Sequence, residues 1–399
     1  MSTAVDNTLD QAWQRVRNAR RIVVKIGSNL LTGSDGLKTA WIEARCAEIV
    51  TLIERGCEVV VVSSGAVAAG RPRMKMSGPP RTLAEKQAAA AAGQGVLMSQ
   101  YDQAFSRSGR HAAQILLTRD DMADRRRYLN ARDTLNTLLK FGLVPVVNEN
   151  DTVVTAELRY GDNDTLAAMV ACLVDADLLI LLSDVDGLYS ADPRHDNSAC
   201  KVPIVSDVTA EIEALAGGVG SDVGTGGMVT KLKAGKKSAR CGCSMVLVDG
   251  SYENPILRVT DHGPVGTLFE PLSGDCAITS RQRWIVNGLG GEGVLHLDKG
   301  ATKALKKGNS LLSMGIIGFT GDFDRGDAVY CCGPDGRKFA KGMISYRWDH
   351  LAQILGHHSR DFEKLLGFQG NDEIIHRDNL VLLEGLSNDN QEEETTSHD

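Results

Sequence analysis

Val59-Val60-Val61-Val62 is an unbroken run of valines that stops at Ser63-Ser64-Gly65. A strand without a polar face has to be buried on both sides, which is typical of a parallel sheet covered by helices on each face. Comparable strand-like runs recur along the first two thirds of the chain, at residues 22–24, 113–117, 144–147, 178–182 and 245–248. Stretches with helical spacing separate them, among them residues 41–54 and 83–105. We therefore predict an α/β fold, a three-layer αβα sandwich with a mainly parallel sheet.

The pattern changes near residue 270. Short strands of alternating polarity, such as residues 293–297 and 328–331, are separated there by glycines, which predicts a small β-barrel. The acidic, polar end of the chain is expected to be disordered. We divide the chain into an N-terminal extension (1–20), a catalytic domain (21–271), a linker (272–290), the β-barrel domain (291–369) and a C-terminal segment with the acidic tail (370–399).

The composition limits the class of protein. The chain has 399 residues, enough for two domains, and a net charge of −7, which argues against a protein that mainly coats nucleic acid. The first part of the chain lacks the apolar core of a signal peptide, and no apolar run is long enough to span a membrane. Nine cysteines without a CxxC pair predict reduced, mostly buried thiols, so we expect a cytoplasmic protein.

Polar residues follow several of the predicted strands, where a parallel sheet binds its ligands. Lys25 ends the first strand, and its ammonium group either neutralises a phosphate or reaches solvent. Ser63-Ser64 opens a helix after the valine strand and either binds an anion or caps that helix. Ser183-Asp184 follows another strand and either contacts a nucleotide or forms an ordinary turn.

Two acidic, amide-rich loops lie close together in the sequence, Asn148-Glu149-Asn150-Asp151 and Gly161-Asp162-Asn163-Asp164. Such loops can hold the amino group of an amino acid, bind Mg²⁺ or orient a lysine, and they can also be surface turns. Their spacing does not match a calcium-binding EF-hand loop. We assign no residue as a metal ligand.

The richest signal is the run Gly224-Thr225-Gly226-Gly227-Met228-Val229-Thr230-Lys231. Its glycines let the backbone approach a ligand and point several N–H groups at one anion. The helix expected to begin near Met228 adds its positive end, and Lys231 lies one turn inside it. The run is neither a Walker A loop nor a dinucleotide-binding glycine motif. Together with Lys25 and the acidic loops, it favours phosphoryl transfer over a flexible surface loop.

These motifs, in this order, resemble those of the glutamate 5-kinases of the amino acid kinase superfamily, over about residues 20–380. The resemblance rests on residues 24–28, 63–70, 129–134, 147–151, 161–164, 186–189 and 224–228. The C-terminal part is similar to a PUA domain, an RNA-binding β-barrel, at residues 300–301, 308–312 and 326–329. The acidic tail beyond Leu386 is an extension to which the resemblance gives no role.

The resemblance implies a role for individual residues. The implied catalytic residues are Lys25, Lys231 and Asp162, of which Asp162 would organise the two lysines. The implied glutamate-binding residues are Ser64, Asp151, Asn163 and Asp164. The implied ATP-binding residues are Lys25, Ser183, Asp184, Thr225, Gly226, Gly227, Met228, Val229, Thr230 and Lys231.

The implied reaction is transfer of the γ-phosphoryl group of ATP to the side-chain carboxylate of L-glutamate, giving L-glutamyl 5-phosphate and ADP, the first step of proline biosynthesis. The attacking carboxylate is ionised at neutral pH and needs no general base, and Mg²⁺ is expected with ATP. The implied partners are proline as a feedback inhibitor, further copies of the chain in a dimer or tetramer, glutamate-5-semialdehyde dehydrogenase as the recipient of the product, and RNA at the PUA-like domain. No membrane partner is expected.

Two alternatives stay open. An aspartate, acetylglutamate or uridylate kinase would share the sheet and the lysine of the first strand. An RNA-binding or regulatory protein with a degenerate kinase domain would account for the PUA-like barrel and its lysines and arginines. We favour a glutamate kinase, because the Gly-Asp-Asn-Asp loop and the barrel suit it and the proposed kinase residues are intact.

Overall fold

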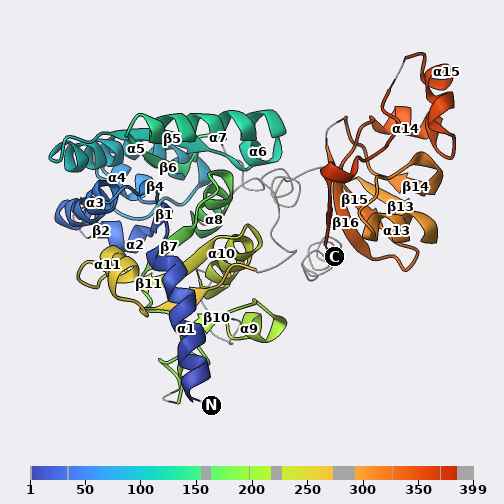
Figure 1. Cartoon of the computed structure of the whole chain (residues 1–399). Coiled ribbons are helices and arrows are strands. Elements are labelled where there is room, and N and C mark those ends of the chain that lie inside the picture. Colours follow the sequence, from blue (N-terminus) through green and yellow to red (C-terminus); the bar gives the residue numbers. More distant parts are fainter. Residues whose placement is uncertain are drawn as a thin grey trace. The chain divides into compact units, whose positions relative to one another are not determined.

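The computed structural model describes residues 2–33, 36–153, 163–196, 198–216, 227–272, 293–325, 327–368 and 370–383. The chain separates into two compact units, a larger one of Met1–Met122 and Arg126–Ala277 and a smaller one that contains Ile278–Asp399. Each unit has its own sheet, as Figure 1 shows. The larger unit carries the motifs of phosphoryl transfer.

The larger unit is built on an eight-stranded sheet (Figure 1). In spatial order its strands are β10 (Ile204–Val205), β12 (Thr267–Phe269), β11 (Ser244–Asp249), β7 (Leu178–Ser183), β1 (Arg21–Ile26), β4 (Glu58–Ser63), β6 (Val144–Glu149) and β5 (Ala112–Leu117). Neighbouring strands are parallel, except that β12 runs antiparallel to β11. The strand order reverses at β1, which has β4 on one side and β7 on the other. Open parallel sheets bind their ligands beyond the carboxyl ends of the strands at such a reversal.

Helices form two layers around this sheet. One layer contains α1 (Ser2–Arg17), α3 (Thr39–Glu54) and α5 (Leu83–Ser106), whose apolar side chains share a core with alternate residues of the central strands. The other layer contains α8 (Asn163–Leu173), which packs on β1, β4 and β7, and α10 (Met228–Arg240), which packs on α8. The predicted αβα sandwich with a mainly parallel sheet is confirmed.

Shorter elements complete the larger unit. They are α2 (Ser28–Leu31), β2 (Thr32–Gly33), β3 (Gly36–Leu37), α4 (Ala66–Gly70), α6 (Arg119–Ala123), α7 (Arg125–Lys140), β8 (Leu188–Tyr189), β9 (Lys201–Val202), α9 (Ala210–Ala214), α11 (Pro255–Leu257) and the π-helix η1 (Arg258–His262). Every strand and helix that the sequence predicted in this unit is present, with ends that differ by at most two residues.

The two sheet faces determine where the side chains of β1 lie. Ile22, Val24 and Ile26 belong to the core beneath α3 and α5. Because successive strand residues point to opposite faces, Lys25 points toward the layer of α8 and α10. A lysine in this position is surrounded by protein, so its ammonium group needs a partner there.

The first part of the chain, which sequence analysis treated as an extension, forms the helix α1. Its Ala12, Trp13 and Val16 are at most 3% exposed and belong to the main core of the larger unit. In the sequence, these residues continue a helical spacing that begins with Val5 and Leu9. This spacing was a signal for an amphipathic helix that the sequence analysis overlooked.

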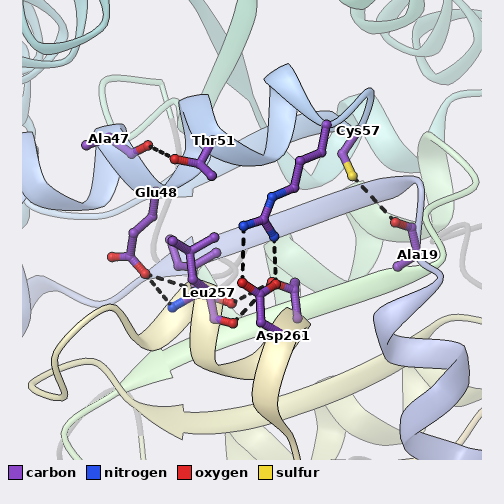
Figure 2. Close-up of polar contacts among 10 residues, drawn as sticks. Ala19, Ala47, Glu48, Thr51, Cys57, Leu257 and Asp261 are labelled. Atoms are coloured by element: carbon purple, nitrogen blue, oxygen red, sulfur yellow. Dashed lines mark hydrogen bonds and ion pairs between the residues drawn. The ribbon is translucent and has the colours of Figure 1, made fainter.

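Helix α3 is joined to α11 and η1 by a buried and an exposed set of charges (Figure 2). The carboxylate of Glu48 accepts hydrogen bonds from the main-chain N–H groups of Ile256 (2.9 Å) and Leu257 (3.1 Å). It also pairs with Arg45. At the end of α3, Arg55 binds both carboxylate oxygens of Asp261, at 2.7 and 3.2 Å. Glu48 thus satisfies N–H groups at the start of a helix, which have no partner within the helix itself.

The expectation of reduced cysteines is wrong at one place. Cys172 of α8 and Cys241, which follows α10, form a disulfide across a sequence separation of 69 residues. Neither cysteine belongs to a recognisable spacing motif, because the pairing arises from the packing of α8 on α10. The described cysteines Cys46, Cys331 and Cys332 are free thiols and are buried, as expected.

The smaller unit contains a five-stranded, mostly antiparallel sheet, in the order β14 (Ile316–Thr320), β13 (Val294–Leu297), β15 (Ala328–Cys332), β16 (Lys338–Met343) and β17 (Leu380–Leu382). Its helices are α13 (Lys299–Lys306), α14 (Trp348–Ile354) and α15 (Phe362–Leu366), and its 3₁₀ turns are η2 (Ser313–Gly315), η3 (Ser359–Asp361) and η4 (Arg377–Asn379). The unit has a core of its own. The prediction of a second, β-rich domain is confirmed. Nowhere in the described ranges does a helix have both the length and the apolarity to cross a bilayer.

Candidate active site

Lys25 lies near the carboxyl end of β1, where it is paired in register with Val62 of β4 and Leu181 of β7. Only 5% of it is exposed. Its ammonium group forms an ion pair with Oδ1 of Asp164, in the first turn of α8. The strand therefore presents this lysine at the point where the strand order reverses.

Asp164 also holds a second lysine. Its carboxylate is completely buried, and its Oδ2 lies 3.2 Å from Nζ of Lys231. The hydroxyl of Thr230 lies 3.2 Å from the same oxygen and 2.7 Å from the carbonyl oxygen of Gly227, so its one hydrogen can be donated to either. Thr230 and Lys231 belong to the first turn of α10, which packs on α8. Because buried charges are tolerated only when they are paired, Asp164 fixes the ammonium groups of Lys25 and Lys231 at one place.

Asn163, the residue before Asp164, joins two strand ends. Its Nδ2 donates to the carbonyl oxygen of Ser63 (3.0 Å), to Oγ of Ser64 (2.8 Å) and to Oδ1 of Asn148 (3.1 Å). The hydroxyl of Ser64 is an acceptor in this contact, so its own hydrogen can be donated to a ligand. Gly65 follows with φ of +98°, a left-handed conformation that favours glycine and turns the chain from β4 into α4.

Ser183 and Asp184 end β7, on the other side of β1. Asp184 accepts hydrogen bonds from Nδ2 of Asn29 (3.1 Å) and from Oγ of Ser183 (3.1 Å). Burial alone would raise the pKa of Asp184, but these hydrogen bonds and the nearby charge of Lys231 outweigh it and lower the pKa. Asp184 is therefore a carboxylate at neutral pH, within electrostatic range of the lysine cluster.

Asp151 lies in the turn that follows β6 and is half-buried. Burial raises the pKa of its carboxyl group to about 6. A carboxylate in this state gains from a cationic ligand, which would compensate for the lost hydration.

The structure brings most of the predicted site residues to one edge of the sheet, in the clusters just described. Met228 and Val229 begin α10, and Gly227 precedes it. The predicted residues Asp162, Thr225 and Gly226 lie outside the described residues.

Two residues that hydrogen-bond the side chains of the candidate site, Asn148 and Asn29, were missed by the sequence analysis. Asn148 lies in one of the quoted loops, but nothing in the sequence gave it an individual role. Asn29 lies two residues after Gly27, and its polar side chain at the end of a buried strand was a signal that could have identified it.

The sequence profile of the amino acid kinase family matches residues 20–249, and that of the PUA domain matches residues 293–366. Curated proteins named glutamate 5-kinase are similar over almost the whole chain. The one from Geobacter sulfurreducens is 48% identical over 366 residues, which are 91% of this chain and 98% of that protein. The chain belongs to the glutamate 5-kinases of the amino acid kinase family.

Other glutamate 5-kinases are similar to this chain to the same degree. Those of Syntrophotalea carbinolica and Allorhizobium ampelinum are each 48% identical to this chain, with coverage of 91% and 92% of it and 97% and 93% of the relative. Among solved structures, the UMP kinase of Bacillus anthracis is 15% identical and aligns with 64% of this chain and 97% of its own, with a TM-score of 0.45. The resemblance to the glutamate 5-kinases and to the PUA domain is confirmed.

Proposed function

We propose that the protein transfers the γ-phosphoryl group of ATP to the side-chain carboxylate of L-glutamate, giving L-glutamyl 5-phosphate and ADP. This reaction is the first step of proline biosynthesis. The proposal is carried by the kinship with glutamate 5-kinases together with the cluster of Lys25, Asp164 and Lys231 at the carboxyl edge of the sheet. The same kinship favours glutamate over the acceptors of the other amino acid kinases.

The two lysines would perform the electrostatic part of the reaction. The attacking carboxylate is already ionised, so the main obstacle is its repulsion by the phosphate charges. Lys25 and Lys231 would neutralise charge on the transferred group, and fixed donors of this kind act most strongly in a buried site. Among the described residues, Asp164 holds both lysines and would take the organising role that the sequence assigned to Asp162. A role for Asp162 itself stays a prediction.

Glutamate would bind beside this cluster, at the ends of β4 and β6. The hydroxyl of Ser64 would donate to a carboxylate of the substrate. The α-ammonium group would be held by Oδ1 of Asn163, which has no donor within the described residues, and by the carboxylate of Asp151. This arrangement would direct the γ-carboxylate of glutamate toward the two lysines.

ATP would bind between the end of β7 and the start of α10, through Ser183, Asp184 and residues 225–231. Mg²⁺ in phosphoryl transfer is usually held by one or two carboxylates and the substrate phosphates, so a single ionised carboxylate such as that of Asp184 fits this ion. Bound there, Mg²⁺ would neutralise the phosphate oxygens of ATP. The main-chain N–H groups at the start of α10 would face the phosphates.

The remaining partners are proposed from the family alone. They are proline as a feedback inhibitor at the glutamate site, further copies of the chain in a dimer or tetramer, and glutamate-5-semialdehyde dehydrogenase as the acceptor of the unstable product. A cytoplasmic location is proposed on the same basis.

RNA is a second proposed ligand, at the PUA domain. A hollow there is lined by the cationic Lys299, Lys306 and Arg337, together with Thr302, Pro334, Asp335 and Phe339. Nζ of Lys306 lies 5.5 Å from the ring centre of Phe339. The ring of Phe339 is only 4% exposed and cannot stack on a base, but the three cationic side chains suit the phosphate groups of RNA. Binding of a single-stranded RNA oligonucleotide should weaken with salt and with Lys306→Ala. Binding unaffected by either change would contradict this second proposal.

Trapping of the acyl phosphate with hydroxylamine tests the proposed reaction. Purified protein with ATP and Mg²⁺ should form hydroxamate with glutamate, and none above background with aspartate or N-acetylglutamate. Proline should reduce the rate. A preference for aspartate or N-acetylglutamate would assign the chain to another acceptor, and no ATP turnover with any of them would contradict a kinase.

A further inference from the structure

Four amide side chains form a directed chain that leads away from the proposed glutamate site. Nδ2 of Asn163 donates to Oδ1 of Asn148 at 3.1 Å, and Nδ2 of Asn148 donates to Oε1 of Gln94 at 3.0 Å. Nε2 of Gln94 in turn lies 3.5 Å from Oε1 of Gln114, a weaker contact. These residues come from α8, β6, α5 and β5, so four separate elements meet in this chain.

Main-chain groups fix the direction of the amides. The main-chain N–H of Glu149 donates to Oδ1 of Asn148 at 2.9 Å, and an N–H can only donate. The oxygen of Asn148 must therefore lie on that side, and its Nδ2 faces Gln94. At the other end, the carbonyl oxygen of Ser63 can only accept, which requires Nδ2 of Asn163 to face it. The group that Gln94 presents to Asn148 is consequently its carbonyl oxygen.

The direction of this chain has a consequence at the substrate site. The NH₂ group of Asn163 is used by Ser63, Ser64 and Asn148, so its carbonyl oxygen is the group that remains for a ligand. Hydrogen bonds aligned head to tail polarise one another, which makes the last carbonyl oxygen a stronger acceptor. An α-ammonium group is the part of glutamate that such an oxygen would bind.

We propose that Gln94 is a positioning residue for the α-ammonium group of the substrate. Gln94 acts through Asn148: together with the main-chain N–H of Glu149 it holds the amide of Asn148 in place, and this amide supports the orientation of Asn163 toward the ammonium group. This inference rests on the proposed function, because it takes glutamate as the ligand of Asn163. Without the acceptor on Gln94, the Nδ2 group of Asn148 loses its partner at a position that is only 3% exposed. A buried donor without a partner favours rotation of the amide, which would set two NH₂ groups against each other.

The test is a set of substitutions on α5. Gln94→Met keeps the length of the side chain and removes its acceptor, and we expect the KM for glutamate to rise about tenfold. The KM for ATP and kcat should stay within about twofold of the wild-type values. Gln94→Glu keeps an acceptor toward Asn148 and should restore the wild-type KM for glutamate. Gln103→Met is the matched control, since Gln103 is exposed on the same helix and its side chain bonds only to Ser99 in the described part of the chain.

Inhibition by glutarate, which is glutamate without its α-ammonium group, separates positioning from a general disturbance of the site. The Ki of glutarate should change less than about twofold in Gln94→Met. An equal loss for glutamate and glutarate, or an unchanged KM for glutamate, would overturn the inference. Should Gln94→Met fail to fold, Gln94→Ala gives the same test, because alanine is well tolerated in the alanine-rich α5. Absence of glutamate-dependent turnover in the wild-type protein would instead refute the proposed function.

Discussion

Two buried carboxylates of the larger unit look alike but serve different purposes. Glu48 is 2% exposed and Asp164 is 0% exposed, and each pairs with a cation. One partner of Glu48 is Arg45 on the same helix. The others are two main-chain N–H groups at the contact between α3 and α11 (Figure 2). Asp164 instead gathers side chains from β1 and α10 at the carboxyl edge of the sheet. Burial and pairing alone therefore do not identify a functional charge, whereas its place in the fold does.

The largest expected effect comes from removing the charge of Asp164. Asp164→Asn keeps the shape of the side chain but no longer holds Lys25 and Lys231, so kcat should fall about a thousandfold. Steady-state kinetics with glutamate and ATP measures this loss, and the KM for glutamate should change much less. A kcat within threefold of the wild-type value would remove the distinction between the two carboxylates.

The second effect concerns stability rather than catalysis. Glu48→Ala leaves Arg45 buried without its partner and removes two hydrogen bonds from the main chain, so the free energy of unfolding should fall by about 3 kcal/mol. Urea denaturation measures this change, and kcat of the folded variant should equal that of the wild type. Glu54→Ala, at an exposed position of the same helix, is the control and should change the stability by less than about 0.5 kcal/mol. A loss of kcat in Glu48→Ala would contradict the structural role.

The disulfide between Cys172 and Cys241 links α8 and α10, the two helices that carry Asp164 and Lys231. Cys172→Ser should lower the free energy of unfolding by about 2 kcal/mol, below the roughly 4 kcal/mol that loop entropy alone allows for such a closed loop. Denaturation with and without a reducing agent should show the same difference in the wild type. The kcat should be almost unchanged, because the ion pairs of Asp164 do not require the covalent link. Equal stability of the two forms would mean that the bond contributes nothing.

The smallest effect is the pH dependence of glutamate binding. Burial raises the pKa of Asp151 to about 6, so its charge is present above this pH and is lost as the pH falls through it. The ammonium and γ-carboxylate groups of glutamate keep their charges between pH 5 and 8. The KM for glutamate should therefore be flat above pH 7 and rise by up to about tenfold per unit below pH 6. Burial also raises the pKa of Glu48, but its titration should not appear in the KM. A KM for glutamate that is flat down to pH 5 would contradict the role of Asp151.

The sequence predicted the sheet well because its strands are buried on both faces, and continuous apolar runs as short as Val59 to Val62 are typical of such strands. It also predicted the cluster residues Lys25 and Lys231. It could not predict which carboxylate lies between them, because Asp162 and Asp164 are equivalent at the level of a motif. The contact between Asn148 and Gln94 and the disulfide depend on the packing of distant elements, which leaves no local pattern in the sequence.

Transfer of oxygen from glutamate to phosphate is the decisive measurement for the proposed reaction. With the γ-carboxylate of glutamate labelled with ¹⁸O, direct attack on ATP places one labelled oxygen between carbon and phosphorus. Hydroxylamine then attacks the carbonyl carbon and releases phosphate that carries this oxygen. We expect one ¹⁸O atom per phosphate released in the presence of glutamate, and almost no release by Asp164→Asn. Phosphate without ¹⁸O would show that water, and not glutamate, is the acceptor.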